Sequence, residues 1–448
     1  MGPGVAAIAR PRTKPRSAAL TTRVSHGCPI VDFAALITAV QGGALIDPAQ
    51  GDVVRGGVTV LIEDGHVLKA GPRSQVSARA DAVVVDGGDL TLLPGLIDCH
   101  VHLDTLGTGL DLAESVMTPP SQLLLKAVPA CRATLDAGFT TVRDAGGTPD
   151  GVRRAVQQGY FPGPRMLLAV QILSQTGGHA DDHFPCGIEL PVFASPAADM
   201  PPSVVDGVEP MRKRVRELIR AGADWIKLCT SGGVLSPGDA PHHATFTLDE
   251  IRAAVEEAAA QGRQVMAHAQ ANAGIKNALR GGVKTIEHGI WLDGDAIEMM
   301  LDGDRRLVPT LIAPLWVMRH ADAGRMPAYA AEKSRQVIGD HRESIRQAIE
   351  AGVKIAFGTD TGVGPHGSNN EELKLLAELG MSPLECIRSA TTVAAETIGV
   401  GGKAGSLQPG AFGDVIGVAG DPLDAIEVLA DAANVRLVVK GGVPVKTP

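Results

Sequence analysis

Short apolar runs rich in β-branched residues stand near both ends of the chain, separated by glycine or Asp-Gly turns. This pattern is typical of β-strands. Because such runs flank a long middle of different character, we expect both ends to build one small β-sandwich, from residues 34–91 and 403–448. The runs are residues 35–40, 58–62, 82–85, 414–418 and 435–439.

The middle of the chain, residues 92–402, alternates apolar runs with helical patterns. The eight runs that read as strands are residues 93–101, 140–144, 166–172, 225–229, 265–269, 285–288, 308–312 and 355–359. Helical patterns fit between most of them, for example at residues 121–137, 210–221, 248–261 and 329–351. Eight repeats of strand and helix predict the α/β class and a closed (β/α)₈ TIM barrel. The proline-rich segment 177–209 has no helical period, and a loop of that length favours a lid or substrate-binding role.

Composition narrows the class of protein. The chain has 448 residues, and 44% of them are hydrophobic, which excludes a disordered chain. Its net charge of −9 argues against a nucleic-acid partner, because phosphate binding needs clustered positive charge. No uncharged apolar stretch of about 20 residues exists, so we expect no membrane span. The six scattered cysteines form no CxxC pair and favour reduced thiols in a cytoplasmic enzyme. Residues 1–33 carry no acid before Asp32, and we interpret them as a disordered arm rather than a targeting peptide.

Ionisable residues gather at the predicted C-terminal ends of the barrel strands. In a (β/α)₈ barrel these ends meet on one face, so we expect the side chains to converge there. Imidazole and carboxylate groups are the usual ligands of zinc and similar divalent ions. The residues in question are His100, His102, Lys227, His268, His288 and Asp360.

Lys227 requires a different role from its neighbours because an ammonium group cannot bind a metal. Burial beside two cations would disfavour its charged form, and the neutral amine can react with CO₂. The resulting carbamate could bridge two metals, which would lower the pKa of a shared water and yield hydroxide. Asp360 would take the proton of that water and pass it to the leaving group.

Each of these residues also has a structural explanation when it is considered alone. Lys227 could pair with an acid, His268 or His288 could be core histidines, and Asp360 could cap a turn. The shared position at successive strand ends favours a joint site.

Two further positions are candidates for contact with a substrate. His179, in Thr-Gly-Gly-His after the third predicted strand, could hydrogen-bond the scissile carbonyl or a substrate carboxylate. Arg143 and Asp144 could bind substrate or form an internal ion pair, and we favour the ion pair.

Several motifs carry a resemblance to a known family. They are Pro-Gly-Leu-Ile-Asp-Cys-His-Val-His, Ile-Glu-His-Gly, Gly-Thr-Asp and Gly-Ser-Leu-Gln-Pro-Gly-Ala-Phe-Gly-Asp-Val. Over about residues 34–446 the chain resembles the amidohydrolase superfamily, in the branch of imidazolonepropionase-like proteins, Xaa-Pro dipeptidases, related carboxypeptidases and ochratoxin-degrading enzymes. The resemblance implies two divalent ions, usually zinc, and a homo-oligomer. It places one ion on His100, His102 and Asp360 and the other on His268 and His288, with carboxylated Lys227 between them.

Gln270 departs from the dipeptidase pattern, in which a tyrosine often follows the fifth-strand His-Ala. Its amide could bind substrate but has a different reach, which leaves the substrate open. We therefore predict a binuclear hydrolase of a small-molecule amide, either a peptidyl or N-acyl amino acid or an aryl amide or carbamate of the ochratoxin type.

Two alternatives stay open at this point. A mononuclear deaminase or cyclic-amidine hydrolase is disfavoured by Lys227 and by the absence of a glutamate near Gln270, where Asn272 and Gly274 stand. A metal-free scaffold is disfavoured because all six ligand positions are kept.

Overall fold

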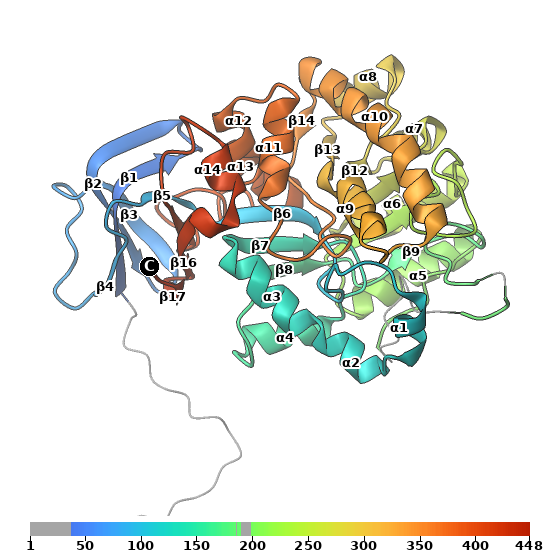
Figure 1. Cartoon of the computed structure of the whole chain (residues 1–448), viewed down its shortest axis with the longest axis horizontal. Helices are drawn as coiled ribbons and strands as arrows, with labels where there is room; N and C mark the ends of the chain where they lie inside the picture. The colour runs from blue at the N-terminus through green and yellow to red at the C-terminus, as the bar shows by residue number, and fades with distance from the viewer. Residues whose placement is uncertain (1–36, 185, 190–198) are drawn as a thin grey trace, which may run out of the picture. The chain divides into compact units, whose positions relative to one another are not determined.

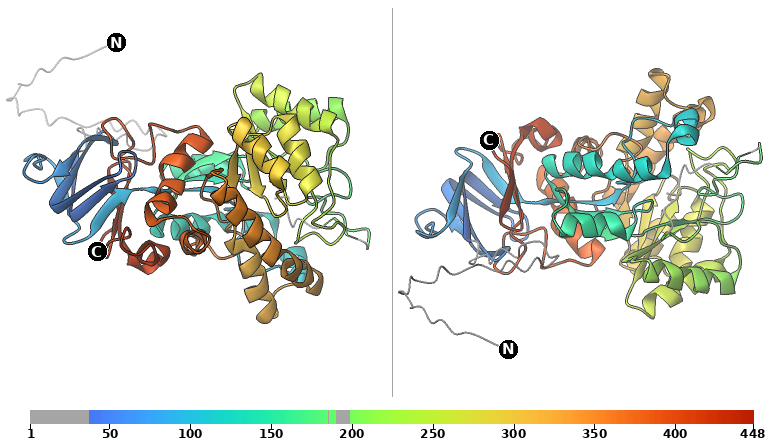
Figure 2. Two further views of the ribbon diagram at one scale, coloured as in Figure 1. Left: turned by 90° about the horizontal axis from the view of Figure 1, so that it is seen from above. Right: turned by 90° about the horizontal axis from the view of Figure 1, so that it is seen from below.

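Strands from both ends of the chain share one sheet in the computed structural model, which describes residues 37–184, 186–189 and 199–448 (Figure 1). The eight strands are joined in the order β17-β16-β15-β5-β1-β2-β3, and β4 pairs with β1. Their bounds are β1 (Ile37–Asp47), β2 (Asp52–Glu63), β3 (His66–Pro72), β4 (Val83–Asp86), β5 (Thr91–Pro94), β15 (Val415–Val418), β16 (Val435–Lys440) and β17 (Val443–Lys446). Both views in Figure 2 place the red C-terminal strands next to the blue N-terminal ones.

This arrangement agrees with a β-rich part built from both chain ends, but the described strands make one sheet, so the predicted two-sheet sandwich is not confirmed. All described residues belong to one structural unit. The boundaries predicted at residues 91 and 402 therefore stay predictions. The predicted arm, residues 1–33, and residues 190–198 of the predicted loop lie outside the described residues.

Two parallel sheets follow the chain in sequence order, as expected for a βα-repeat. The first joins β6 (Leu96–Val101), β7 (Phe139–Asp144) and β8 (Arg165–Leu168). The second joins β9 (Ile172–Leu173), β10 (Trp225–Cys229), β11 (Gln264–Ala269), β12 (Thr285–His288), β13 (Arg306–Val308) and β14 (Lys354–Ile355).

Backbone hydrogen bonds connect the edges of these two sheets. The Cys99 N–H of β6 donates to Phe357 O (2.9 Å), just after β14, and Asp224 N–H, just before β10, donates to Leu168 O of β8 (2.7 Å). The α/β class is thus confirmed.

Four predicted strands differ from the observed ones, and the backbone explains three of these differences. In the fourth, the predicted run 355–359, the observed strand β14 ends at Ile355. The run 93–101 is divided at Gly95, because β5 pairs antiparallel with β15 while β6 pairs with β7. The run 166–172 is divided by Val170, whose φ of 67° lies outside the strand region. The run 308–312 extends past β13 because Thr310 has a φ of 54° and a helix begins at Ile312.

Helices cover the parallel strands, and the four predicted helical patterns correspond to α2 with α3, α5, α6 and α10 (Figure 1). α6 begins at a capping box in which Thr247 and Glu250 satisfy each other's backbone N–H groups. None of the helices in the described ranges is long and apolar enough to cross a membrane. The helices are α1 (Leu112–Met117), α2 (Pro120–Leu125), α3 (Ala127–Asp136), α4 (Asp150–Gln157), α5 (Val208–Arg220), α6 (Leu248–Ala259), α7 (Asn272–Gly281), α8 (Gly294–Asp302), α9 (Ile312–Asp322), α10 (Ala328–Glu350), α11 (Glu371–Glu378), α12 (Pro383–Ser389), α13 (Thr392–Ile398) and α14 (Glu427–Ala430).

Candidate metal centre

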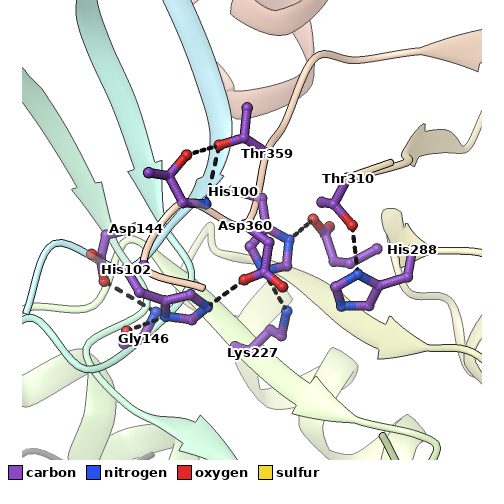
Figure 3. Close-up of polar contacts among 12 residues, drawn as sticks. His100, His102, Asp144, Gly146, Lys227, His288, Thr310, Thr359 and Asp360 are labelled. Atoms are coloured by element: carbon purple, nitrogen blue, oxygen red, sulfur yellow. Dashed lines mark hydrogen bonds and ion pairs between the residues drawn. The ribbon is translucent and has the colours of Figure 1, made fainter. Parts of the chain in front are cut away.

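Four of the predicted site residues meet, from β6 and the residue after it, from the middle of β10 and from the segment that follows β14 (Figure 3). One ligand atom each from His100, His102 and Asp360 lies within 4.8 Å of the others. Asp360 Oδ1 is 3.2 Å from His102 Nε2 and 3.5 Å from His100 Nε2. Lys227 Nζ lies 3.4 Å from His100 Nε2. This is the group of imidazoles, carboxylate and amine that the strand-end pattern predicts.

The remaining predicted histidines extend this cluster in a row of ring contacts. The ring centroid of His288 is 5.2 Å from that of His100 and 4.5 Å from that of His268. His179 stacks on His268 at 4.2 Å. All five histidines line one cavity of about 220 Å³. The structure thus brings every predicted site residue to one cavity, and their roles as ligands stay a prediction.

Backbone strain marks two of these positions. His288 has a φ of 71° and Asp360 a φ of 58°, in the left-handed region that costs free energy for side chains other than glycine. His288 is the last residue of β12, and Asp360 lies five residues after the end of β14. Such outliers gather at functional sites, where surrounding contacts hold them in place.

A buried ion pair orients His100. Its Nδ1–H donates to Glu287 Oε2 (2.7 Å), and Arg143 donates to Glu287 Oε1 (2.9 Å). The side chains of Arg143 and Glu287 are both fully buried. The predicted internal ion pair of Arg143 therefore exists, but its partner is Glu287. Asp144 instead accepts hydrogen bonds from Leu103 N–H and Gly146 N–H.

Hydrogen bonds at the far side of the rings determine which nitrogen faces the cavity. His102 Nδ1 lies 2.7 Å from Gly146 O, and His268 Nε2 lies 3.0 Å from Gly232 O. A carbonyl oxygen only accepts, so each of these nitrogens carries a proton, and in the neutral form of each ring the opposite nitrogen keeps its lone pair. His288 Nδ1 makes the corresponding contact with Thr310 Oγ1 (2.7 Å).

Burial sets the charge of most of these groups. It lowers the pKa of His100 to about 4, and it lowers the pKa of His268 and His288 well below the usual range. It also lowers the pKa of Lys227, which favours the neutral amine. Burial acts on His102 in the same direction, but the adjacent Asp360 carboxylate outweighs it and raises the pKa to about 9.

His179 belongs to a polar network that the sequence analysis did not find. Its Nδ1 lies 2.8 Å from Ser236 Oγ and 3.7 Å from Asp239 Oδ2. Lys333 of α10 donates to the carbonyls of Gly233 (3.1 Å), Ser236 (2.7 Å) and Asp239 (2.6 Å), and so holds the loop after β10 in place. Only the Ser-Gly-Gly-Val-Leu-Ser-Pro stretch could have indicated this loop, and nothing in the sequence indicates Lys333.

A cavity lined by imidazoles, a carboxylate and a buried amine near the ends of parallel strands offers the groups that divalent metal ions prefer as ligands. Residues 91–445 match the model of the amidohydrolase family, and the chain therefore belongs to that family. Members of this family generally use divalent metals, and the chain is a hydrolase that acts on C–N bonds.

Three similar proteins agree with this assignment. Ochratoxinase from Aspergillus niger is 32% identical over 92% of this chain and 88% of its own, and its crystal structure superimposes with a TM-score of 0.79 over 92% and 96% of the two chains. A prolidase complexed with N-methylphosphonate-L-proline has 36% identity and a TM-score of 0.83, over 92% of this chain and 100% of its own. A Xaa-Pro dipeptidase with bound methionine has 30% identity and a TM-score of 0.80 over the same shares.

Proposed function

We propose that this protein is a binuclear metal-dependent hydrolase that cleaves an amide bond in a peptidyl or N-acyl amino acid, or in an aryl amide or carbamate. The observation that carries the proposal is the environment of Lys227. Its side chain is buried, its Nζ faces His100 Nε2 at 3.4 Å, and no carboxylate of the described residues lies within 4.0 Å of it. A structural lysine would have an ion-pair partner in such a place.

The donor set fits two divalent ions. His100, His102 and Asp360 would hold one, His268 and His288 the other, and Lys227 as a carbamate would lie between them. Each histidine has its far nitrogen bonded to a protein group, which is the usual support of a metal-binding imidazole. Bound ions would supply Lewis acidity, lowering the pKa of a water and polarising the substrate carbonyl.

The chain's own residues account for the proton transfers and for substrate orientation. Histidine contacts outweigh burial and lower the pKa of Asp360, so its carboxylate is ionised and can accept a proton at Oδ1 or Oδ2. The same carboxyl group would return that proton to the leaving nitrogen. His179, anchored by Ser236 and stacked on His268, would hydrogen-bond the substrate carbonyl or carboxylate.

The architecture around this site is proposed on the same basis. The backbone bonds between the two parallel sheets support a closed (β/α)₈ barrel, with the candidate site at the C-terminal ends of its strands. The ochratoxinase and prolidase relatives support amide substrates. We also propose that the protein acts on a small molecule, forms a homo-oligomer and is located in the cytoplasm.

Metal content and turnover of Lys227→Ala test the function. We expect the wild-type chain, purified without chelator, to hold two equivalents of metal by plasma mass spectrometry. Lys227→Ala should lose metal and at least ~100-fold in kcat/KM on N-acyl amino acids, dipeptides and aryl amides. Lys374→Ala, at an exposed position of α11, serves as the matched control.

Two results would contradict the proposal. Full metal content and full turnover of Lys227→Ala would exclude the bridging role of the lysine. One equivalent of metal in the wild type, with turnover of cyclic amidines or aminopurines instead of amides, would favour the mononuclear alternative.

A further inference from the structure

His288, the last residue of β12, has a left-handed backbone that its surroundings must hold in place. Its φ of 71° costs free energy for a residue with a side chain. The β11 strand still pairs with His288, but on the other side the pairing of β12 with β13 ends one residue earlier, at Glu287 and Val308. On the β13 side, the support of His288 therefore has to come from other elements.

A side chain of α10 supplies this support with one donor. His341 Nε2 lies 3.0 Å from His288 O and 2.9 Å from Pro309 O, the carbonyl that follows β13 directly. Both partners are carbonyl oxygens, which only accept, so Nε2 carries a proton and donates to them. The residue is only 1% exposed, so these bonds are shielded from water. His341 thus ties the carbonyl of His288 to the end of the neighbouring strand.

A second side chain of α10 holds the next carbonyl along the chain. Ser344 stands three residues after His341, on the same face of the helix. Its hydroxyl donates to Gly289 O (2.7 Å) and accepts from Leu292 N–H (3.0 Å). The helix α10 therefore anchors two consecutive carbonyls, those of residues 288 and 289.

The ring of His288 depends on the same region of the structure. Its Nδ1 contacts Thr310 Oγ1 at 2.7 Å (Figure 3). The two N–H groups after Thr310, those of residues 311–312, donate to the fully buried carboxyl group of Glu372 at 2.9 and 2.8 Å. Because His341 holds the carbonyl just before Thr310, it connects the backbone of His288 to the turn that carries its ring contact.

We propose that His341 is a positioning residue that holds His288 in the geometry needed to bind a divalent ion. This inference rests on the proposed two-ion site and names the residue on which one of its two positions depends. Without the donor of His341, two buried carbonyls lose a partner and the left-handed backbone of His288 loses its support on the β13 side. The backbone should then relax, and the ring should turn away from His268.

Only one of the two ions should be affected. The ion assigned to His268 and His288 loses a ligand when His288 moves. The ion assigned to His100, His102 and Asp360 keeps its supports, among them the hydrogen bond of His100 to Glu287. A merely structural role of His341 would lower stability without this selective loss.

Two variants with similar polarity test the role of the donor. His341→Gln keeps an amide N–H group at about the reach of the imidazole Nε2, whereas the amide of His341→Asn is shorter by one methylene group. In protein purified without chelator, we expect two equivalents of metal in His341→Gln and one in His341→Asn. The dissociation constant of the lost ion should rise ~10–100-fold. Thr38→Val removes a buried hydrogen bond to Gly442 O in the eight-stranded sheet and, as the control for lost stability, should keep two equivalents.

Crystal structures of the metal-free chain give a second readout that does not depend on metal. We expect His288 to keep a φ near 71° and its contact with Thr310 in the wild type and in His341→Gln, and to lose both in His341→Asn. If His341→Asn does not fold, Ser344→Ala takes its place, because it frees the carbonyl next to His288, and it should lose the same ion.

Two equivalents of metal in His341→Asn, or in Ser344→Ala where that variant replaces it, would overturn the proposal. An equal loss in His341→Gln and His341→Asn would assign the effect to the volume of the ring and would overturn it as well. A wild-type chain with fewer than two equivalents contradicts the proposed function separately. The metal-free structures then decide, since an unchanged His288 in His341→Asn refutes the positioning role and a displaced one supports it.

Discussion

Glu287 should be the residue on which both the stability of the core around the parallel strands and the orientation of His100 depend. The side chain is fully buried, accepts from His100 Nδ1–H at 2.7 Å and pairs with buried Arg143 at 2.9 Å. Glu287→Gln preserves its shape and removes its charge. Arg143 is then left as a buried cation without a counter-charge, which is a strongly destabilising situation.

The pKa of Glu287 provides the magnitude. Burial raises it, but the charge of Arg143 and the hydrogen bond from His100 outweigh burial and lower it from 4.5 to about 2. This shift corresponds to about 3 kcal/mol of unfolding free energy at neutral pH. Because the pKa is lower in the folded chain, this contribution is complete above pH 4.5 and is lost as the pH falls toward 2. The difference between wild type and Glu287→Gln should therefore be about 1 kcal/mol smaller at about pH 3.5.

Urea denaturation at both pH values, with metal content measured in parallel, checks this reasoning. We expect Glu287→Gln to lose about 3 kcal/mol at neutral pH and to bind metal ~10–100-fold more weakly, because His100 loses its orienting partner. Glu298→Gln, at an exposed position of α8, is the matched control. Equal stability and equal metal affinity of the two variants would show that the buried pair has neither role.

Two further variants address the loop that holds His179. Gly233→Ala would place a Cβ 2.1 Å from His179 Cε1, so we expect the His179 ring to lose its stacking on His268. The value of kcat/KM should then fall ~100-fold at near-normal stability. Gly238→Ala, which has open space around its Cβ, is the control and should have wild-type kinetics. Lys333→Met removes three hydrogen bonds to loop carbonyls. We therefore expect a several-fold rise in KM and faster proteolysis within residues 233–239. An unchanged KM and an unchanged cleavage rate would exclude a positioning role for Lys333.

The sequence was sufficient to predict the parallel strands and the convergence of the candidate ligands, because both depend on local periodicity. Lys227 and His268 lie in the C-terminal half of their strands and Asp360 follows the last one, and in a βα-repeat that position indicates which face they share. The sequence indicated the α/β class for the same reason. Strand limits were less accurate where a single backbone angle decides them, as at Thr310.

The partners of these residues could not be predicted, since they depend on distances through space rather than along the chain. Arg143 and Glu287 are separated by 144 positions, and Asp144 is the nearer acid in sequence. Lys333 is separated by 94 positions from the Asp239 carbonyl that it binds. A residue pattern at one strand end contains no information about which distant helix will face it.

Gln270 shows how the two kinds of information combine. The sequence marks it as a departure, because a glutamine stands where related dipeptidases often have tyrosine, but it does not show what the departure does. The structure adds that Gln270 lines the cavity and that its amide oxygen is buried without a hydrogen-bond donor among the described residues. A tyrosine hydroxyl in that place could donate to a substrate oxygen, and the glutamine Nε2–H₂ group can donate as well, but from a shorter side chain of different shape. The change therefore keeps a hydrogen-bond donor and alters its reach, which is why we expect this chain to prefer other substrates than the dipeptidases.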